Sequence, residues 1–185
     1  MADTDTRPLN DVDFATLAVL FEQAHASDTP MRVELSTRLR WLGGLATEGT
    51  GANFRAIGDD IDRSHHGFAT DLPAPLAGSD TGMGPTELLL AATSACVTTT
   101  LVELATAEGI RLDRVEVDAA TELDARGVFG VEGVPVGPSG ITLRFGVDGD
   151  GEPEQFEALA NAAVDASPTA NAVTRPTPIR VEVTR

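Results

Sequence analysis

The sequence lacks several residue types on which whole classes of protein depend. Its 185 residues include one cysteine, one tryptophan, no lysine and no tyrosine, and aromatic residues make up 4% of the chain. A single cysteine excludes an intrachain disulfide framework and is typical of a reducing compartment. With so few aromatic side chains, the core has to be built from Val, Leu, Ile and Ala.

Positive charge is also scarce. Thirteen basic residues, all arginine, stand against 29 acidic ones, for a formal net charge of −16. Such a surface repels phosphate backbones and anionic membranes, so we expect neither a nucleic acid nor a membrane as a partner. The first ten residues, MADTDTRPLN, are polar and acidic and do not resemble a secretory signal. We therefore expect a cytoplasmic protein.

The longest uncharged apolar run, residues 88–102, covers 15 residues and is rich in Thr and Ala. It is short for a membrane span, which needs about 20 residues. Pro85 suits the first position of a helix, Glu87 suits its positive end, and Gly109 suits the position after its end. These signals predict a helix from Pro85 to about Glu108. Because its middle is apolar on every side, we expect it to be buried, under a wrapping sheet or a second subunit.

The rest of the chain alternates between strand and helix patterns. Strict alternation predicts four strands, and the Leu45–Ile57 segment predicts one or two weaker ones around a turn at Gly49–Gly51. The four strands are expected over residues 32–41, 115–123, 141–147 and 179–183. Helical spacing predicts helices over residues 11–26 and near 156–164, with Asn10 or Asp11 capping the first and Ser167-Pro168 opening a third. The chain therefore reads as an α+β protein, with an N-terminal extension over 1–30, a domain over 31–185 and a long loop over 58–85 as a site-forming segment.

A family resemblance rests on residues 84–96, GPTELLLAATSAC. This segment resembles the Pro-x-Glu-Leu-Leu helix, ending in Cys, of the osmotically induced protein C (OsmC) and organic hydroperoxide resistance families. Residues 71–82 resemble the loop before that helix, Ala166–Thr169 lie where those families often have Cys-Pro-Val, and residues 177–183 resemble their final strand. The resemblance covers about residues 32–185.

The resemblance implies a fold of antiparallel sheets wrapped around a long buried central helix, assembled as an intertwined homodimer. It also implies a thiol-dependent peroxidase, in which a thiolate attacks a hydroperoxide and becomes a sulfenic acid. A second Cys then closes a disulfide, and an Arg–Glu pair holds the thiolate. Cys96 matches the position of the attacking thiol.

The usual partners of that thiol are replaced. Ser167 stands at the position of the resolving thiol, and a hydroxyl cannot resolve a sulfenic acid. We expect Ser167 to serve as a helix N-cap instead. In the peroxidases the Glu that pairs with the Arg directly follows the Pro, and here that residue is Thr86, with Glu87 one residue later. Asp71 falls at one family location of the Arg. The evident reason for a lowered Cys96 pKa is then gone. Six other residues are candidates for the cation that replaces the family Arg beside the thiolate: Arg38, Arg40, Arg55, Arg63, His65 and His66. The paired histidines have no metal-ligand spacing around them, so we expect no metal.

Two functional hypotheses follow. The first is a one-Cys thiol-dependent reductase of organic hydroperoxides, which uses Cys96, needs no cofactor and takes its electrons from an external thiol. The second is a non-peroxidase family member that binds a small molecule in a pocket near Cys96. Candidate pocket residues for either are Thr86, Glu87, Asp71, His66 and Ser167.

Overall fold

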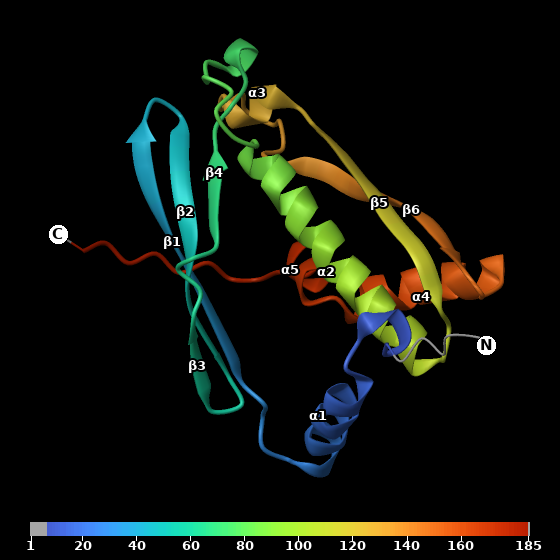
Figure 1. Ribbon diagram of the computed structural model, residues 1–185. Helices are drawn as coiled ribbons and strands as arrows, with labels where there is room; N and C mark the ends of the chain where they lie inside the picture. Colours follow the sequence, from blue (N-terminus) through green and yellow to red (C-terminus); the bar gives the residue numbers. More distant parts are fainter. Residues whose placement is uncertain (1–6, 185) are drawn as a thin grey trace. The chain divides into compact units, whose positions relative to one another are not determined.

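The computed structural model describes residues 7–184, and it divides into two compact units (Figure 1). The N-terminal unit consists of residues 15–89, and the C-terminal unit consists of residues 90–184 together with 7–14. The first six residues of the predicted N-terminal extension, and residue 185, lie outside the described residues.

The N-terminal unit contains one helix and an antiparallel sheet. Strand β2 pairs with β1, β3 and β4, so it is the centre of this sheet. The elements are α1 (Phe14–Ala26), β1 (Val33–Gly43), β2 (Ala46–Ala56), β3 (Asp59–Asp62), β4 (Gly67–Thr70) and the short 3-10 helix η2 (Ala74–Leu76). The predicted strand over residues 32–41 is confirmed, and the long loop contains more regular structure than its composition suggested.

The predicted turn at Gly49–Gly51 is wrong, because β2 runs through it without a break. The two glycines are there for close packing. A Cβ on Gly49 would lie 2.4 Å from the ring of Phe68, and one on Gly51 would lie 2.7 Å from the backbone oxygen of Arg63. Glycine therefore marks the close approach of neighbouring segments inside a strand.

The C-terminal unit places a long two-stranded antiparallel ribbon beside helices (Figure 1). Its elements are η1 (Leu9–Asp11), most of α2 (Pro85–Ala107), β5 (Leu112–Leu123), α3 (Ala125–Val128), β6 (Pro138–Gly149), α4 (Pro153–Ala166) and α5 (Pro168–Thr174). The buried core is made of small and aliphatic residues, as the shortage of aromatics predicts: Val97, Leu101, Ala105, Ile110, Leu159, Ala163 and Ala170.

Helix α2 begins at Pro85 and ends at Ala107, and Gly109 after it has a φ of +76°, as the helix signals predict. Within the single chain the helix is buried along one stripe only, at Thr93, Val97, Leu101, Ala105 and Thr106. The expectation that it is buried on every side is therefore not met by one chain alone. By length and composition α2 could also cross a membrane, but the core helix of a soluble protein passes the same test.

Asn10 does not cap α1 as expected. Its backbone has a φ of +54°, and its side chain ties the start of the described chain to the end of α2. The amide nitrogen donates to Thr106 Oγ1 and to the Ile110 carbonyl, both at 2.9 Å, and the amide oxygen accepts from the Leu112 backbone N–H at 2.8 Å. Asn10 is thus a structural anchor within the C-terminal unit.

The predicted last strand is wrong for the single chain. The segment after α5 is extended but joins no ladder among the described residues (Figure 1). Its alternating side chains Ile179, Val181 and Val183 are more than 80% exposed. The pattern is that of a strand, but a strand needs a partner edge, and the described part of the chain supplies none here. The overall class is confirmed: a mixed α+β protein with antiparallel sheets and a long helix.

Candidate functional site

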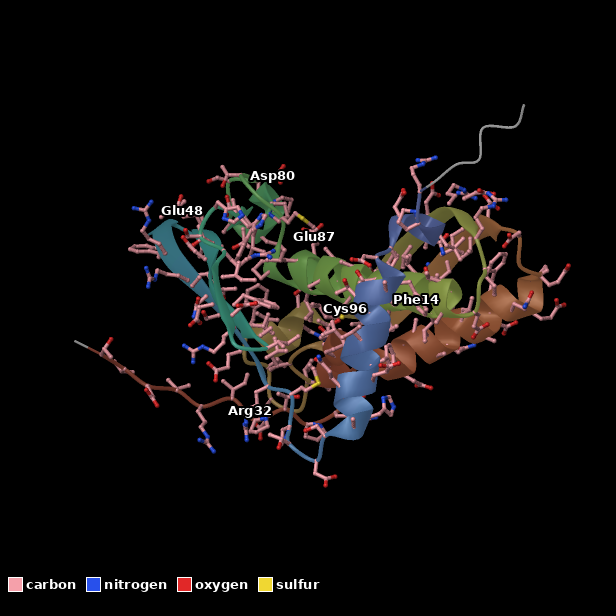
Figure 2. The ribbon with its side chains drawn as sticks, turned by 60° about the horizontal axis from the view of Figure 1, so that its bottom comes forward. Phe14, Arg32, Glu48, Asp80, Glu87 and Cys96 are labelled. Carbon is pink, nitrogen blue, oxygen red and sulfur yellow. The ribbon has the colours of Figure 1, made fainter. Side chains whose placement is uncertain are left out.

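Cys96 lies in the middle of α2, inside the C-terminal unit (Figure 2). Cys96 is a free cysteine and is partly buried. The backbone around it is regular helix, and the Thr100 hydroxyl donates to the Cys96 carbonyl at 3.1 Å rather than to the sulfur. The hydrogen-bond donors to the thiol come from another element.

That element is the junction between α4 and α5. Helix α4 ends at Ala166, and Ser167 turns the chain as the C-cap of α4 and the N-cap of α5. Its side chain is completely buried and accepts from the Ala170 backbone N–H at 3.3 Å, so the predicted capping role is confirmed. The Ser167 and Thr169 hydroxyl oxygens lie 3.2 Å apart, which places two hydroxyl groups side by side.

Both hydroxyls are hydrogen-bonded to the sulfur of Cys96, and the backbone N–H of Thr169 also donates to it. Burial is the largest single influence on this thiol and raises its pKa, and the charge of Glu103 raises it further. The three hydrogen bonds act in the opposite direction and together hold the pKa of Cys96 below its ordinary value. The physical cause is that a donor stabilises the thiolate more than the neutral thiol. We call Ser167 and Thr169 the hydroxyl pair.

Sequence reasoning found Cys96 and Ser167 but not the contact between them, and it missed Thr169. It treated Ser167 only as a cap in place of a resolving thiol. The available signal was the Ser-Pro-Thr order at a helix N-terminus, where the backbone N–H groups of the first turn have no partner within the helix and are free to donate elsewhere. The evident reason for a lowered pKa was expected to be gone with the Arg–Glu pair, and these donors lower the pKa of Cys96 in its place.

Asp71 has a structural environment within the N-terminal unit. Its side chain is 1% exposed and accepts four hydrogen bonds from the loop that follows it. The donors are the backbone N–H groups of Leu72, Ser79 and Thr81, at 2.8 to 3.2 Å, and the Thr81 hydroxyl at 2.8 Å. The Thr81 hydroxyl is the main reason that the pKa of Asp71 is lowered. Asp71 therefore closes the loop of residues 72–81 upon itself.

Glu87 serves the start of α2. Its carboxylate accepts from the Gly84 backbone N–H at 2.6 Å, which satisfies a donor at the helix N-terminus. Thr86 precedes it in the first turn and is partly buried. The structural role considered for Glu87, a charge at a helix N-terminus, is the one seen.

Three of the candidate arginines of the N-terminal unit have partners within that unit. Arg40 pairs with Glu48, Arg55 pairs with Asp60 at 2.8 Å, and Arg63 stacks on Phe54. His66 is exposed, and its ring centre lies 4.0 Å from that of His65, whose charge lowers the pKa of His66. Among residues 7–184 no group of three or more His, Cys, Asp or Glu side chains could hold a metal ion.

Comparison with known families identifies the group to which this architecture belongs. Residues 78–182, more than half of the chain, match the model of the OsmC family, described as OsmC-like protein. The chain therefore belongs to the OsmC-like proteins, the family associated with organic hydroperoxide resistance and stress response. No curated protein matches the sequence.

Several solved structures share the fold at low sequence identity. An osmotic stress induced and detoxification response protein from Psychrobacter arcticus is 15% identical, with a TM-score of 0.55 over 78% of this chain and 91% of its own. An OsmC-like protein from Mycoplasma pneumoniae is 16% identical, with a TM-score of 0.54 over 80% and 89%. An organic hydroperoxide resistance protein from Legionella pneumophila is 20% identical, with a TM-score of 0.51 over 76% and 88%. At these identities the likeness establishes the fold.

Proposed function

We propose that this protein is a one-Cys, thiol-dependent reductase of organic hydroperoxides. The observation that carries the proposal is the set of three hydrogen bonds from Ser167 and Thr169 to the sulfur of Cys96, which favours the thiolate. Membership of a family associated with hydroperoxide resistance agrees with it. The thiolate is the nucleophilic form of cysteine, so a group that stabilises it raises the reactive fraction at neutral pH.

The proposed chemistry begins with attack by the Cys96 thiolate on the outer oxygen of a hydroperoxide, ROOH. A sulfur–oxygen bond forms and the O–O bond breaks. The alkoxide that leaves takes a proton and departs as the alcohol, ROH. Cys96 is oxidised to the sulfenic acid, and the hydroperoxide is reduced.

The cycle is completed by an external dithiol, because the hydroxyl of Ser167 cannot form a disulfide. One thiol of the reductant attacks the Cys96 sulfur, the new S–S bond forms, and the hydroxyl leaves as water. The second thiol of the reductant then displaces Cys96 as the thiolate, and the reductant departs as its disulfide. No metal or organic cofactor is needed for either half of the cycle.

The experiment that tests this function is consumption of cumene hydroperoxide in the presence of dithiothreitol. The wild-type protein should consume it at a rate proportional to enzyme concentration, and Cys96→Ser should reduce that rate to the level of dithiothreitol alone. Thr100→Val is the matched control, since its hydroxyl contacts the carbonyl of Cys96 and not the sulfur. Equal rates for wild type and Cys96→Ser would rule the function out.

The second candidate is a family member without peroxidase activity that binds a small molecule beside Cys96. The observation in its favour is that the described donors to the Cys96 sulfur are hydroxyls and one backbone N–H, without a guanidinium among them. A protein whose Cys96 resists hydroperoxide, but is protected from alkylation by a bound ligand, would support this second function.

We also propose that the protein is a cytoplasmic homodimer. Apolar side chains on β1 are widely exposed in the single chain, among them Leu35 at 73% and Trp41 at 71%, as are those of the C-terminal segment. Exposed apolar surface of this kind is typical of an interface between subunits. Sedimentation equilibrium should give twice the mass of one chain, and a monomer at micromolar concentration would contradict this proposal.

A further inference from the structure

The C-terminal unit contains a groove in which two apolar stripes face each other without closing. One stripe comes from alternate residues of β6, among them Leu143 and Phe145, which share one face of the strand. The other comes from Phe156, Ala160 and Val164, which recur every fourth residue on one side of α4. We call this the β6–α4 groove.

The space between the stripes is large enough for a ligand. Its volume is about 870 Å³, within the range of roughly 300–1,000 Å³ that small-molecule sites occupy. At the end where β6 turns into α4, the lining includes Gly149, Gly151 and Pro153. The groove does not include Cys96 or the hydroxyl pair, so it is separate from the thiol site.

Charged residues in the lining have one sign. Asp113, Asp148 and Glu157 line the groove, and no Arg or His does. Asp113 and Asp148 each pair with an arginine outside the lining. The described residues form no ion pair with Glu157, which stands on the exposed side of α4. Glu157 is therefore the acidic group of the lining that has no ion pair among the described residues, and it forms the acidic edge of the groove. An apolar floor beside this carboxylate favours a molecule with an apolar body and a positive head.

We propose that the β6–α4 groove binds a small amphiphilic organic cation, with its apolar body between Phe145 and Phe156 and its cationic head beside Glu157. The same edge repels carboxylates and phosphates of equal size. The apolar body supplies the affinity through burial, and the acidic edge selects the sign of the charge.

The test measures binding to the full-length protein by isothermal titration calorimetry. Octyltrimethylammonium is the cationic probe, and octanoate and octanol are the anionic and neutral probes of the same chain length. Octyltrimethylammonium should saturate one site per chain and bind at least tenfold more tightly than octanoate. Glu157→Gln should weaken it by about fivefold, the upper range for an exposed ion pair. Glu154→Gln, also exposed on α4 but outside the lining, should bind as wild type does.

A second variant tests the floor of the groove. Ala160→Phe puts a ring into the space and should abolish binding while circular dichroism and peroxide consumption stay unchanged. Equal binding of octanoate and octyltrimethylammonium, or equal loss in the Glu157 and Glu154 variants, would overturn the proposal. So would a change in sedimentation mass on addition of the cation, since that would show that a second copy of the chain occupies the groove.

Discussion

The buried hydroxyl of Ser167 donates a hydrogen bond to the sulfur of Cys96, and so joins the α4–α5 junction to the middle of α2. Ser167 occupies the place where the resemblance puts a resolving thiol, and the structure shows that this place does contact the cysteine. A hydroxyl therefore contacts the Cys96 sulfur from the position at which the resemblance implies a thiol. In the proposed function, the hydroxyl of Ser167 stabilises the Cys96 thiolate but cannot form a disulfide with it.

Thr169→Val should make Cys96 less reactive. Valine keeps the shape and the backbone N–H but removes the hydroxyl donor, so the pKa of the thiol rises and less thiolate is present at pH 7. A hydrogen bond to a charged group contributes at least about 1.4 kcal/mol, so alkylation by iodoacetamide at pH 7 should slow by about tenfold. Measured across pH, the rate curve should move to higher pH.

Two further variants serve as a second test of the hydroxyl pair and as a control. Ser167→Ala should slow alkylation in the same direction, with a loss of about 1 kcal/mol in stability because the α5 cap is removed as well. Thr100→Val should leave the pH profile of alkylation unchanged. A Thr169→Val profile that superimposes on the wild type would show that the hydroxyl pair does not stabilise the thiolate.

Ser167→Cys should convert the site to two-Cys chemistry. Because the replaced hydroxyl contacts the Cys96 sulfur, a thiol at the same position can attack a sulfenic acid there and close a disulfide. Non-reducing peptide mapping after one equivalent of hydroperoxide should find the disulfide between residues 96 and 167. Ser94→Cys is the control, because a residue two positions away on the same helix points to another side.

Asp71→Asn should destabilise the protein through the loop of residues 72–81. The pKa of Asp71 is lower in the folded chain than in the unfolded one. Its contribution to stability is therefore present above its unfolded pKa and is lost as the pH falls through its folded value. Urea unfolding should show a large difference between wild type and Asp71→Asn at pH 7 that narrows toward pH 3. Asp80→Asn, exposed in the same loop, should show no comparable difference.

Asn10→Gly should lower the free energy of unfolding by about 2 kcal/mol, through the loss of three partly buried hydrogen bonds. Glycine keeps the positive φ at no steric cost, so the effect isolates the side chain. Asn10→Ala should cost about 1 kcal/mol more because of backbone strain. Chemical unfolding at pH 7 measures both, and a Gly variant as stable as wild type would contradict the anchoring role.

The fold was predictable where local patterns decide it. Pro85, Gly109 and the Ser167-Pro168 pair mark helix ends through backbone chemistry that needs no distant partner. The prediction of a strand at 179–183 was wrong for the single chain because strand pairing depends on an edge elsewhere. The prediction of a turn at Gly49–Gly51 was wrong because those glycines make room for Phe68 and Arg63, which approach them closely. Both failures concern contacts that a local pattern does not specify.

The same limit applies to the site. Cys96 was found because the helix around it resembles a family motif, and Ser167 because it stands at a family position. Thr169 was missed, since its importance lies in a hydrogen bond that crosses between α5 and α2. Asp71 was selected because it falls at one location of the Arg, whereas its role as a buried acceptor of loop N–H groups depends on the folded loop. The residue type alone does not show that Thr169 donates to the Cys96 sulfur or that Asp71 accepts from loop N–H groups.

The central claim is that Cys96 is a peroxide-reactive thiol, and trapping of its sulfenic acid tests it most directly. Reduced protein should be mixed with one equivalent of cumene hydroperoxide and dimedone at pH 7, and peptides should then be mapped by mass spectrometry. We predict stoichiometric dimedone addition at Cys96, reduced by about tenfold in initial rate in Thr169→Val. Full recovery of the unmodified Cys96 thiol would contradict the claim.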